Sequence, residues 1–283
     1  MGSIWHCGCA RNGNGIFLID HPYRMNTLIA NFKANPVDLE TARHLFDSIA
    51  EAARTNPGVE VVVCPPAVFL AGLSEKTAGA ANNLMLGAQD VFWQNHGPYT
   101  GAITPDMLNA LGVTHVLIGH SERRAIGETD EMVNKKMLAV LTAGLTPVYL
   151  VGEPERDEGA KRDILIDQMT NGLKGIAWSS ASRIRFVYEP AWAISTTSGG
   201  EAETPDGAAE SAELLRSILV RIYPEAPSDK TRFLYGGSVN AQNLSAFLAK
   251  DIFCGAVVGG ASLRSDEFAR MISITASNPD HDA

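Results

Sequence analysis

The chain has 283 residues, of which 45% are hydrophobic and 19% are charged, as is ordinary for a globular protein with a full core. The formal net charge of −9 argues against a nucleic-acid surface and offers no overall attraction for an anionic ligand, so any anion site must be local. No apolar run approaches the roughly 20 residues that span a membrane, and the N-terminus lacks the features of a secretory signal. The four cysteines form no dense framework, which favours a reducing compartment.

The N-terminal stretch differs from the rest of the chain in its mixture of apolar and polar residues and has no clear hydrophobic period. His6, Cys7 and Cys9 fall within it, but their spacing is not a standard zinc pattern and a fourth ligand is missing, so no metal site is predicted. The domain limits that we predict are an N-terminal extension over 1–26, a catalytic domain over 27–277 and a C-terminal tail over 278–283.

From residue 27 onwards, short apolar runs alternate with helical stretches. The runs are apolar throughout rather than alternating, which is typical of parallel strands buried on both faces. The predicted strands cover 27–32, 59–64, 83–89, 113–119, 146–151, 183–189, 232–237 and 254–260. The clearest predicted helices cover 37–54, 130–144 and 206–222.

Two helix starts are well marked, because Thr104 and Thr204 each offer a hydroxyl cap and are each followed by a proline at the first helical position. Eight strands that alternate with helices over about 250 residues predict an α/β protein, a single (β/α)8 TIM barrel with an N-terminal extension. A doubly wound open sheet is the alternative, although no GxGxxG pattern follows the first strand.

Chemistry in such a barrel sits at the carboxyl ends of the strands, and polar residues gather there in this sequence. Paired glycines allow backbone N–H groups to approach an anion closely. The residues at the strand ends are Asn31, Lys33, His120, Ser121, Glu122, Glu189, Gly236, Gly237, Ser238, Gly259 and Gly260. Each has an ordinary structural interpretation when taken alone, such as a solvated lysine, a core histidine or a tight turn. Together they predict one site with a cation, an imidazole, carboxylates and an anion-binding backbone.

The same stretches resemble the triosephosphate isomerase family. The motifs follow the order of that family from residue 28 to about residue 275, nearly the whole chain. They are NFK (31–33), CPP (64–66), GAQD (87–90), YTG (99–101), IGHSERR (118–124), VGE (151–153), VYEPAWAI (187–194), LYGGSV (234–239) and VVGGASL (257–263). The resemblance implies a TIM barrel and an aldose–ketose isomerase, an intramolecular oxidoreductase of glycolysis and gluconeogenesis. It also implies a homodimer that acts on a small phosphorylated sugar without a cofactor. Together with the net charge, the cysteine pattern and the lack of a long apolar run, this leads us to expect a cytoplasmic protein with no metal, nucleic acid or membrane partner.

The resemblance assigns a role to each strand-end residue. Glu189 is implied as the base that moves a proton between two substrate carbons, and His120 as the electrophile that polarises the carbonyl. The family is the standard example of a neutral histidine in that role. Lys33 is implied to stabilise the developing enediolate and the phosphate. The remaining implied residues are Asn31, Ser195, Ser238, Gly259 and Gly260 for substrate binding, with Glu122, Ser121 and Thr100 in support.

The stretch YEPAWAISTTSGG (188–200) is interpreted as the base followed by a lid, with Trp192 at the near hinge and glycines at the far hinge. The residues at 195–197 are Ser-Thr-Thr where the family has Gly-Thr-Gly, and the segment is about three residues longer than usual. We therefore expect closure in a shifted conformation, with the backbone amide of Ser195 or Thr196 reaching the phosphate.

Two further functions stay open beside interconversion of dihydroxyacetone phosphate and D-glyceraldehyde 3-phosphate. The longer lid leaves room for a longer sugar phosphate such as a tetrulose phosphate, isomerised or epimerised in the same barrel. A barrel that has lost turnover and only binds phosphate is the other, although it would have no need for Lys33, His120 and Glu189 together. For the dimer, Thr100 is implied to enter the partner, and Ala102 replaces a glutamate that would pair with Arg123.

Overall fold

The computed structural model describes residues 25–77, 79–194, 202–227 and 231–278. Its strands form a closed barrel in chain order, and every neighbouring pair is parallel. The strands are β1 (Asn26–Asn31), β2 (Val59–Cys64), β3 (Leu84–Ala88), β4 (Val113–Ile118), β5 (Thr146–Val151), β6 (Arg185–Tyr188), β7 (Phe233–Tyr235) and β8 (Phe253–Val258). The predicted (β/α)8 architecture is therefore confirmed, and the open-sheet alternative is wrong because β1 pairs with β8.

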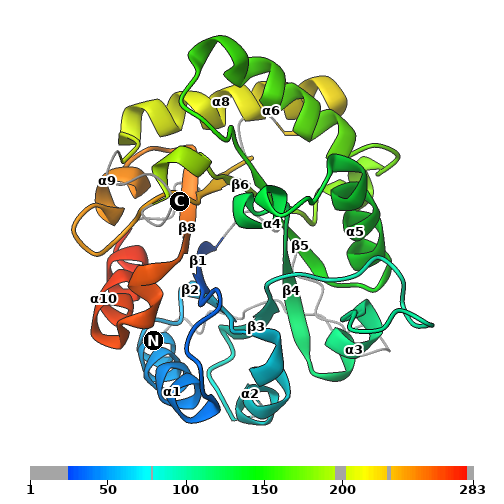
Figure 1. Ribbon diagram of the computed structural model, residues 1–283. Coiled ribbons are helices and arrows are strands. Elements are labelled where there is room, and N and C mark those ends of the chain that lie inside the picture. The colour runs from blue at the N-terminus through cyan, green and yellow to red at the C-terminus, as the bar shows by residue number, and fades with distance from the viewer. Residues whose placement is uncertain (1–24, 78, 195–201, 228–230, 279–283) are drawn as a thin grey trace, which may run out of the picture.

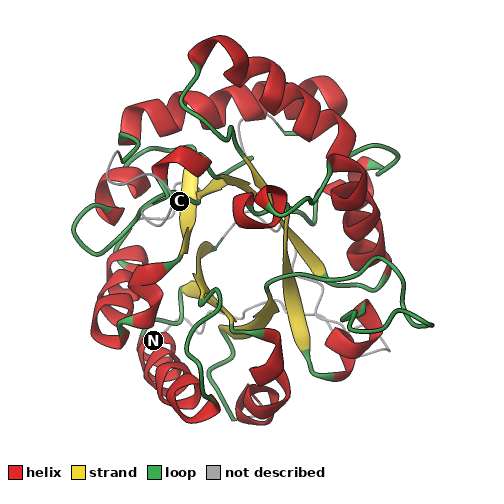
Figure 2. Ribbon diagram, viewed as in Figure 1, coloured by secondary structure: helices red, strands yellow, loops and turns green. Residues whose placement is uncertain are grey.

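Helices surround the barrel as an outer ring in the view of Figure 1, except for the short α4, which lies near the centre of the view, and Figure 2 separates the helices from the strands. They are α1 (Leu39–Thr55), α2 (Leu70–Thr77), α3 (Pro105–Ala110), α4 (Ser121–Ala125), α5 (Asp130–Thr142), α6 (Glu158–Gly172), α7 (Trp178–Ala181), α8 (Pro205–Ile222), α9 (Leu244–Leu248) and α10 (Ser265–Ala276). Three 3-10 turns, η1 (Ala67–Phe69), η2 (Ala191–Ala193) and η3 (Gly260–Leu263), follow β2, β6 and β8.

The helix starts form where the sequence places hydroxyl caps. Thr104 and Thr204 have extended backbones, and their side-chain oxygens accept from the N–H groups of Met107 and Gly207. Pro105 and Pro205 then occupy the first helical turn, where a missing N–H costs nothing. Helix α1 begins two residues later than predicted, because Asp38 caps it and accepts from the N–H of Thr41.

Two apolar layers hold the barrel together. The larger layer lies between the strands and the surrounding helices, and the smaller one fills the barrel itself. Because side chains alternate along a strand, each strand supplies both layers. The buried residues inside the barrel are Ile29, Val62, Cys64, Leu117, Val148, Leu150, Val187, Leu234 and Val257. The barrel is thus a packed core, and substrate access is confined to its ends.

A buried polar cluster lies inside the barrel near the amino ends of the strands, next to the apolar layer. The Glu60 carboxylate accepts from the Thr27 hydroxyl at 3.0 Å and from an Arg185 Nη2 at 3.1 Å. The ring of His115 lies 3.9 Å from the same carboxylate. These residues belong to β1, β2, β4 and β6, at the end of the barrel opposite the glycine pairs.

The first strand begins at Asn26, one residue before the predicted start of the catalytic domain, and the last helix ends at Ala276. The domain limits at both ends stay a prediction. Among the described helices, none has the length and apolarity to cross a membrane.

Candidate active site

A cavity of about 240 Å³ opens at the carboxyl ends of the strands. It brings together residues that follow five of the eight strands, as the sequence predicted for this end of the barrel. Its lining is Asn31, Lys33, His120, Glu189, Ile194, Gly236, Gly237, Ser238, Val239, Asn240, Val257, Gly259, Gly260, Ala261 and Arg264. The cavity therefore holds a base candidate, an imidazole and a cation, together with the glycine-rich loops after β7 and β8.

Lys33 follows β1 with a backbone φ of 54°, a left-handed conformation that is uncommon for a residue other than glycine. Its N–H donates to the side-chain oxygen of Asn31 at 3.1 Å, and its carbonyl accepts from the amide of Gln89 at 2.8 Å. These two bonds fix the backbone in a conformation that costs energy by itself. The Lys33 ammonium lies 2.6 Å from the Glu122 carboxylate.

His120 follows β4 and caps the short helix α4. Its Nδ1 accepts a hydrogen bond from the backbone N–H of Glu122 at 3.1 Å, so that nitrogen carries no proton. The remaining proton of a neutral ring is then on Nε2, which lies 3.1 Å from a carboxylate oxygen of Glu189. The helix end thus selects a tautomer that presents an N–H donor to the cavity.

Glu189 follows β6, and its side chain is 3% exposed. One carboxylate oxygen faces His120, while the other accepts from the backbone N–H of Ser121 at 2.8 Å. Burial raises the pKa of Glu189 above its usual 4.5, although His120, the Ser121 hydrogen bond and Lys33 each act to lower it. A carboxylate that burial makes more basic is suited to removing a proton from carbon.

Two glycines let the backbone pass close to Glu189. A Cβ on Gly152 would lie 1.9 Å from the Glu189 carbonyl oxygen, a contact that no side chain tolerates. A Cβ on Gly236 would lie 3.0 Å from the Glu189 Cβ. The loops after β5 and β7 therefore close around the base only because they lack side chains at these points.

Gly259 follows β8 and Gly260 begins η3, on the side of the cavity next to Lys33. A Cβ on Gly259 would approach the Lys33 Cε to 3.2 Å, so the glycine leaves room for the lysine stem beside its backbone. Ser238 follows β7 and lines the same side. This half of the cavity combines small residues and an adjacent cation, a combination that suits an anionic group.

Several predicted supporting residues and the predicted lid are not part of the cavity lining that the structure describes. Ser121 does not line the cavity, but its backbone N–H contacts Glu189. Thr100 is exposed on the loop between β3 and α3, outside the cavity lining. Ser195 and the rest of the predicted lid, through residue 200, lie outside the described residues. Arg123 pairs within its own chain, 2.8 Å from Asp90.

Trp192, predicted at the near hinge, is 8% exposed, and its side chain is held by contacts with Glu153 and Arg156. Its indole N–H donates to a carboxylate oxygen of Glu153 at 2.9 Å, and the Tyr188 hydroxyl donates to the same oxygen at 2.9 Å. The guanidinium of Arg156 lies 5.0 Å from the centre of the indole ring. The VGE motif therefore supplies a buried carboxylate that fixes the residues on both sides of Glu189.

Sequence reasoning missed three residues that shape the site. Gln89 fixes the Lys33 backbone, Asn240 lines the cavity beyond Ser238, and Arg264 lines it beyond the second glycine pair. Their positions shortly after the ends of β3, β7 and β8 are a signal that the strand pattern already offered. Among the described residues, no group of three or more His, Cys, Asp or Glu side chains is placed to hold a metal ion.

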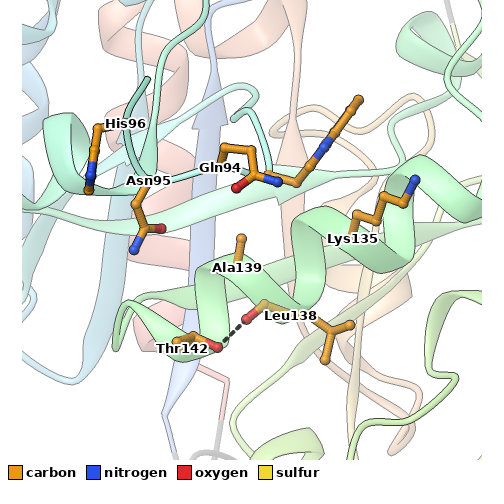
Figure 3. A pocket seen from close by; sticks show the side chains of 8 residues that line it. Gln94, Asn95, His96, Lys135, Leu138, Ala139 and Thr142 are labelled. Atoms are coloured by element: carbon orange, nitrogen blue, oxygen red, sulfur yellow. Dashed lines mark hydrogen bonds between the residues drawn. The ribbon is translucent and has the colours of Figure 1, made fainter. Parts of the chain in front are cut away.

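A larger cavity of about 590 Å³ lies elsewhere, between the loop after β3 and helix α5 (Figure 3). Its lining is Trp93, Gln94, Asn95, His96, Lys135, Leu138, Ala139 and Thr142. No carboxylate belongs to this lining, and the residues that follow the other strands are absent from it. Size alone would favour this cavity, but the smaller one holds the convergent ionisable groups and is the candidate active site.

The family model for triosephosphate isomerase matches residues 26–275. A triosephosphate isomerase of Carboxydothermus hydrogenoformans is 39% identical over 251 residues, which cover 87% of this chain and 96% of that protein. One of Thermoanaerobacter sp. (strain X514) is 43% identical over 253 residues, or 88% of this chain and 99% of that protein. The barrel, the site and these matches agree, and the chain belongs to the triosephosphate isomerase family.

Proposed function

We propose that this chain interconverts dihydroxyacetone phosphate and D-glyceraldehyde 3-phosphate, with Glu189, His120 and Lys33 as its catalytic residues. The observation that carries the proposal is the 3.1 Å approach of His120 Nε2 to the buried Glu189 carboxylate in a cavity that Lys33 also lines. A base and a hydrogen-bond donor are thereby aimed at the same small volume. Proton transfer next to a carbonyl needs both groups.

In this mechanism the Glu189 carboxylate removes a proton from C1 of dihydroxyacetone phosphate. The electrons of the broken C–H bond form the C1–C2 double bond of an enediolate, whose charge rests on the C2 oxygen. The Nε2–H of His120 and the ammonium of Lys33 stabilise that oxygen. Once the proton on the C1 oxygen has moved to the C2 oxygen, Glu189 returns its own proton to C2, which gives the aldehyde at C1.

The phosphate is assigned to the side of the cavity formed by the loops after β7 and β8, at Ser238, Gly259 and Gly260. Asn31 supports the site indirectly, because its side chain holds the backbone N–H of Lys33. Glu122 offsets part of the lysine charge from 2.6 Å away. Binding energy from the unreacting phosphate is then available to position the reacting carbons.

A coupled assay with purified protein tests the proposal directly. Isomerisation of D-glyceraldehyde 3-phosphate is expected, and a Lys33→Met variant that folds normally is expected to lose most of it. The same assay with a four-carbon ketose phosphate tests the tetrulose alternative. A clear preference for the four-carbon substrate, or no turnover of either, would contradict the proposal.

We also propose that the protein is a homodimer. Four exposed apolar residues, Val37, Val68, Tyr99 and Ile126, lie in the segments after β1, β2, β3 and β4, which are adjacent in the barrel. Neighbouring strand ends place them on one side of the molecule, and exposed apolar surface of this kind favours association. Thr100 is assigned to the same interface, on the loop that carries Tyr99.

Sedimentation at micromolar concentration tests this assembly. The parent is expected to sediment as a dimer, and Tyr99→Asp is expected to shift it towards the monomer because a charge is placed in an apolar contact. Met107→Asp serves as a control, since Met107 is also exposed but lies on α3. A monomeric parent, or equal effects of the two variants, would contradict the proposal.

The proposed reaction is a step of glycolysis and gluconeogenesis, so we place the protein in the cytoplasm. The thiols of Cys64 and Cys254 are both free, as suits a reducing compartment. Cell fractionation with an antibody to the chain would test the assignment, and recovery outside the soluble fraction would contradict it.

A further inference from the structure

Arg264 lines the active-site cavity at the end of the turn η3, beyond the glycine pair that follows β8. Its side chain is 62% exposed, so it occupies the rim rather than the floor. Within the described lining, the only permanently cationic side chains are those of Lys33 and Arg264. The Lys33 side chain lies within the cavity beside Gly259, whereas Arg264 follows η3 at the rim.

The guanidinium of Arg264 is held by a single residue. Its Nε donates to the carboxylate of Glu267, one turn into α10. The other carboxylate oxygen of Glu267 accepts from the backbone N–H of Ala241 at 3.5 Å, in the loop after β7. Glu267 therefore ties the segment after β8 to the segment after β7, and those two segments form the phosphate side of the cavity.

The contact through Nε leaves the two terminal nitrogens of Arg264 available. In the described part of the chain they make no hydrogen bond. Terminal guanidinium nitrogens carry four of the five N–H donors of arginine, in a geometry that matches phosphate oxygens. The overall charge of −9 gives no attraction for an anion, so a local cation at this rim has a large relative effect.

We propose that Arg264 is a specificity-determining residue that recognises the phosphate group of the substrate from the rim of the cavity, with Glu267 as its positioning residue. The inference rests on the proposed function only in identifying the anion as the phosphate of a sugar phosphate. Arg264 acts by attraction in the ground state and in the transition state alike. Its loss therefore weakens binding and leaves the chemical step unchanged.

Inorganic phosphate is the direct probe, because it binds without turnover. The rise in the melting temperature of the protein with phosphate concentration gives a dissociation constant by linkage. Arg264→Gln is expected to weaken phosphate binding by about three- to tenfold, the effect of one rim charge on a dianion. In the isomerase assay the same variant is expected to raise KM by a similar factor and to keep kcat within about twofold.

Arg270 provides a matched control. It lies in α10 one turn beyond Glu267, and it does not line the cavity. Its positive charge, like that of Arg264, acts to lower the pKa of Glu267. Arg270→Gln is expected to leave phosphate binding and KM unchanged. Arg264→Lys keeps the charge but not the fork of N–H donors, so its phosphate binding is expected to fall between those of Arg264→Gln and the parent.

Three results would overturn the inference: equal phosphate binding by Arg264→Gln and the parent, equal losses in Arg264→Gln and Arg270→Gln, or a fall in kcat without a change in KM. Failure of the proposed function gives a different pattern. The parent would then not isomerise triose phosphates, while phosphate would still stabilise it more than it stabilises Arg264→Gln.

Discussion

The most informative single residue is Glu189, a carboxylate that is buried and yet must be ionised to act as a base. Replacing it with glutamine preserves its shape and its contact with the Ser121 N–H but removes the basic oxygen. Glu189→Gln is expected to lower kcat by about 10²- to 10⁴-fold, the usual contribution of a positioned general base. Steady-state kinetics check this, with circular dichroism to confirm an unchanged fold. Activity within a few-fold of the parent would contradict the assignment.

Glu189→Gln lowers activity but is expected to raise the stability of the fold. Because the pKa of Glu189 in the folded protein lies above its usual 4.5, the folded state disfavours the ionised form relative to the unfolded chain. Folding therefore loses stability as pH rises from about 4.5 through the folded pKa, and the glutamine variant does not share that loss. At pH 7 Glu189→Gln is expected to have the higher melting temperature, and at pH 4 the difference is expected to shrink. A variant that melts lower at both pH values would contradict this account.

Lys33 influences the base from a distance, and that influence is measurable. Its charge acts to lower the pKa of Glu189, against the larger effect of burial. Lys33→Met is therefore expected to raise the pKa of Glu189 further, as followed by carbon NMR of a labelled carboxyl group. Lys135→Met is the control, because Lys135 does not line the active-site cavity. An unchanged titration of Glu189 in Lys33→Met would show that the two groups are not coupled.

At the scale of elements, the start of α8, a helix of the outer ring, depends on one hydroxyl. Thr204 accepts from the N–H of Gly207 at 3.0 Å and is followed by Pro205. Thr204→Ala is expected to lower the free energy of unfolding by about 1 kcal/mol, as typical for loss of an N-cap. Thr204→Ser keeps the hydroxyl and is expected to lose less than half as much. Urea unfolding measures both, and equal losses would contradict the capping role.

The elements were largely predictable, because strand periodicity and capping residues are local signals. All eight strands begin and end within two residues of their predicted limits, and α8 begins at Pro205 as Thr204 indicates. Contacts that join distant segments were less accessible. The approach of Gly152 to Glu189 and the hold of Gln89 on Lys33 connect different strands, and nothing in either local sequence encodes the partner. Arg264 follows β8 closely enough for the strand pattern to point to it, but its place at the rim depends on the turn η3, which the sequence analysis did not predict.

For the whole molecule, the two ends of the barrel have different tasks. The carboxyl end presents ionisable groups to a cavity, where Glu189 must stay available for reaction. The amino end encloses Glu60, whose carboxylate accepts from Arg185 at 3.1 Å and lies 3.9 Å from the ring of His115. Burial alone would raise the pKa of Glu60, but Arg185, His115 and the Thr27 hydroxyl outweigh it and hold that pKa below 4.5. The same residue type is thus basic at one end and firmly ionised at the other.

This contrast predicts that the amino-end cluster supports the fold and not the reaction. Arg185→Met leaves the Glu60 carboxylate buried without its main partner, and is expected to lower the free energy of unfolding by about 3–5 kcal/mol. Adding Glu60→Gln removes the unpaired charge, so the double variant is expected to be more stable than Arg185→Met alone. For each variant, kcat is expected to stay within about twofold of the parent under conditions where the protein is folded.

The stability loss of Arg185→Met should also depend on pH. Because the pKa of Glu60 is depressed, its contribution to stability is largest above pH 4.5 and becomes smaller as pH falls through that pKa. The loss in free energy of unfolding of Arg185→Met is therefore expected to be smaller in acid. Urea unfolding at pH 7 and pH 4 measures this, and a double variant less stable than Arg185→Met would contradict the role of the pair.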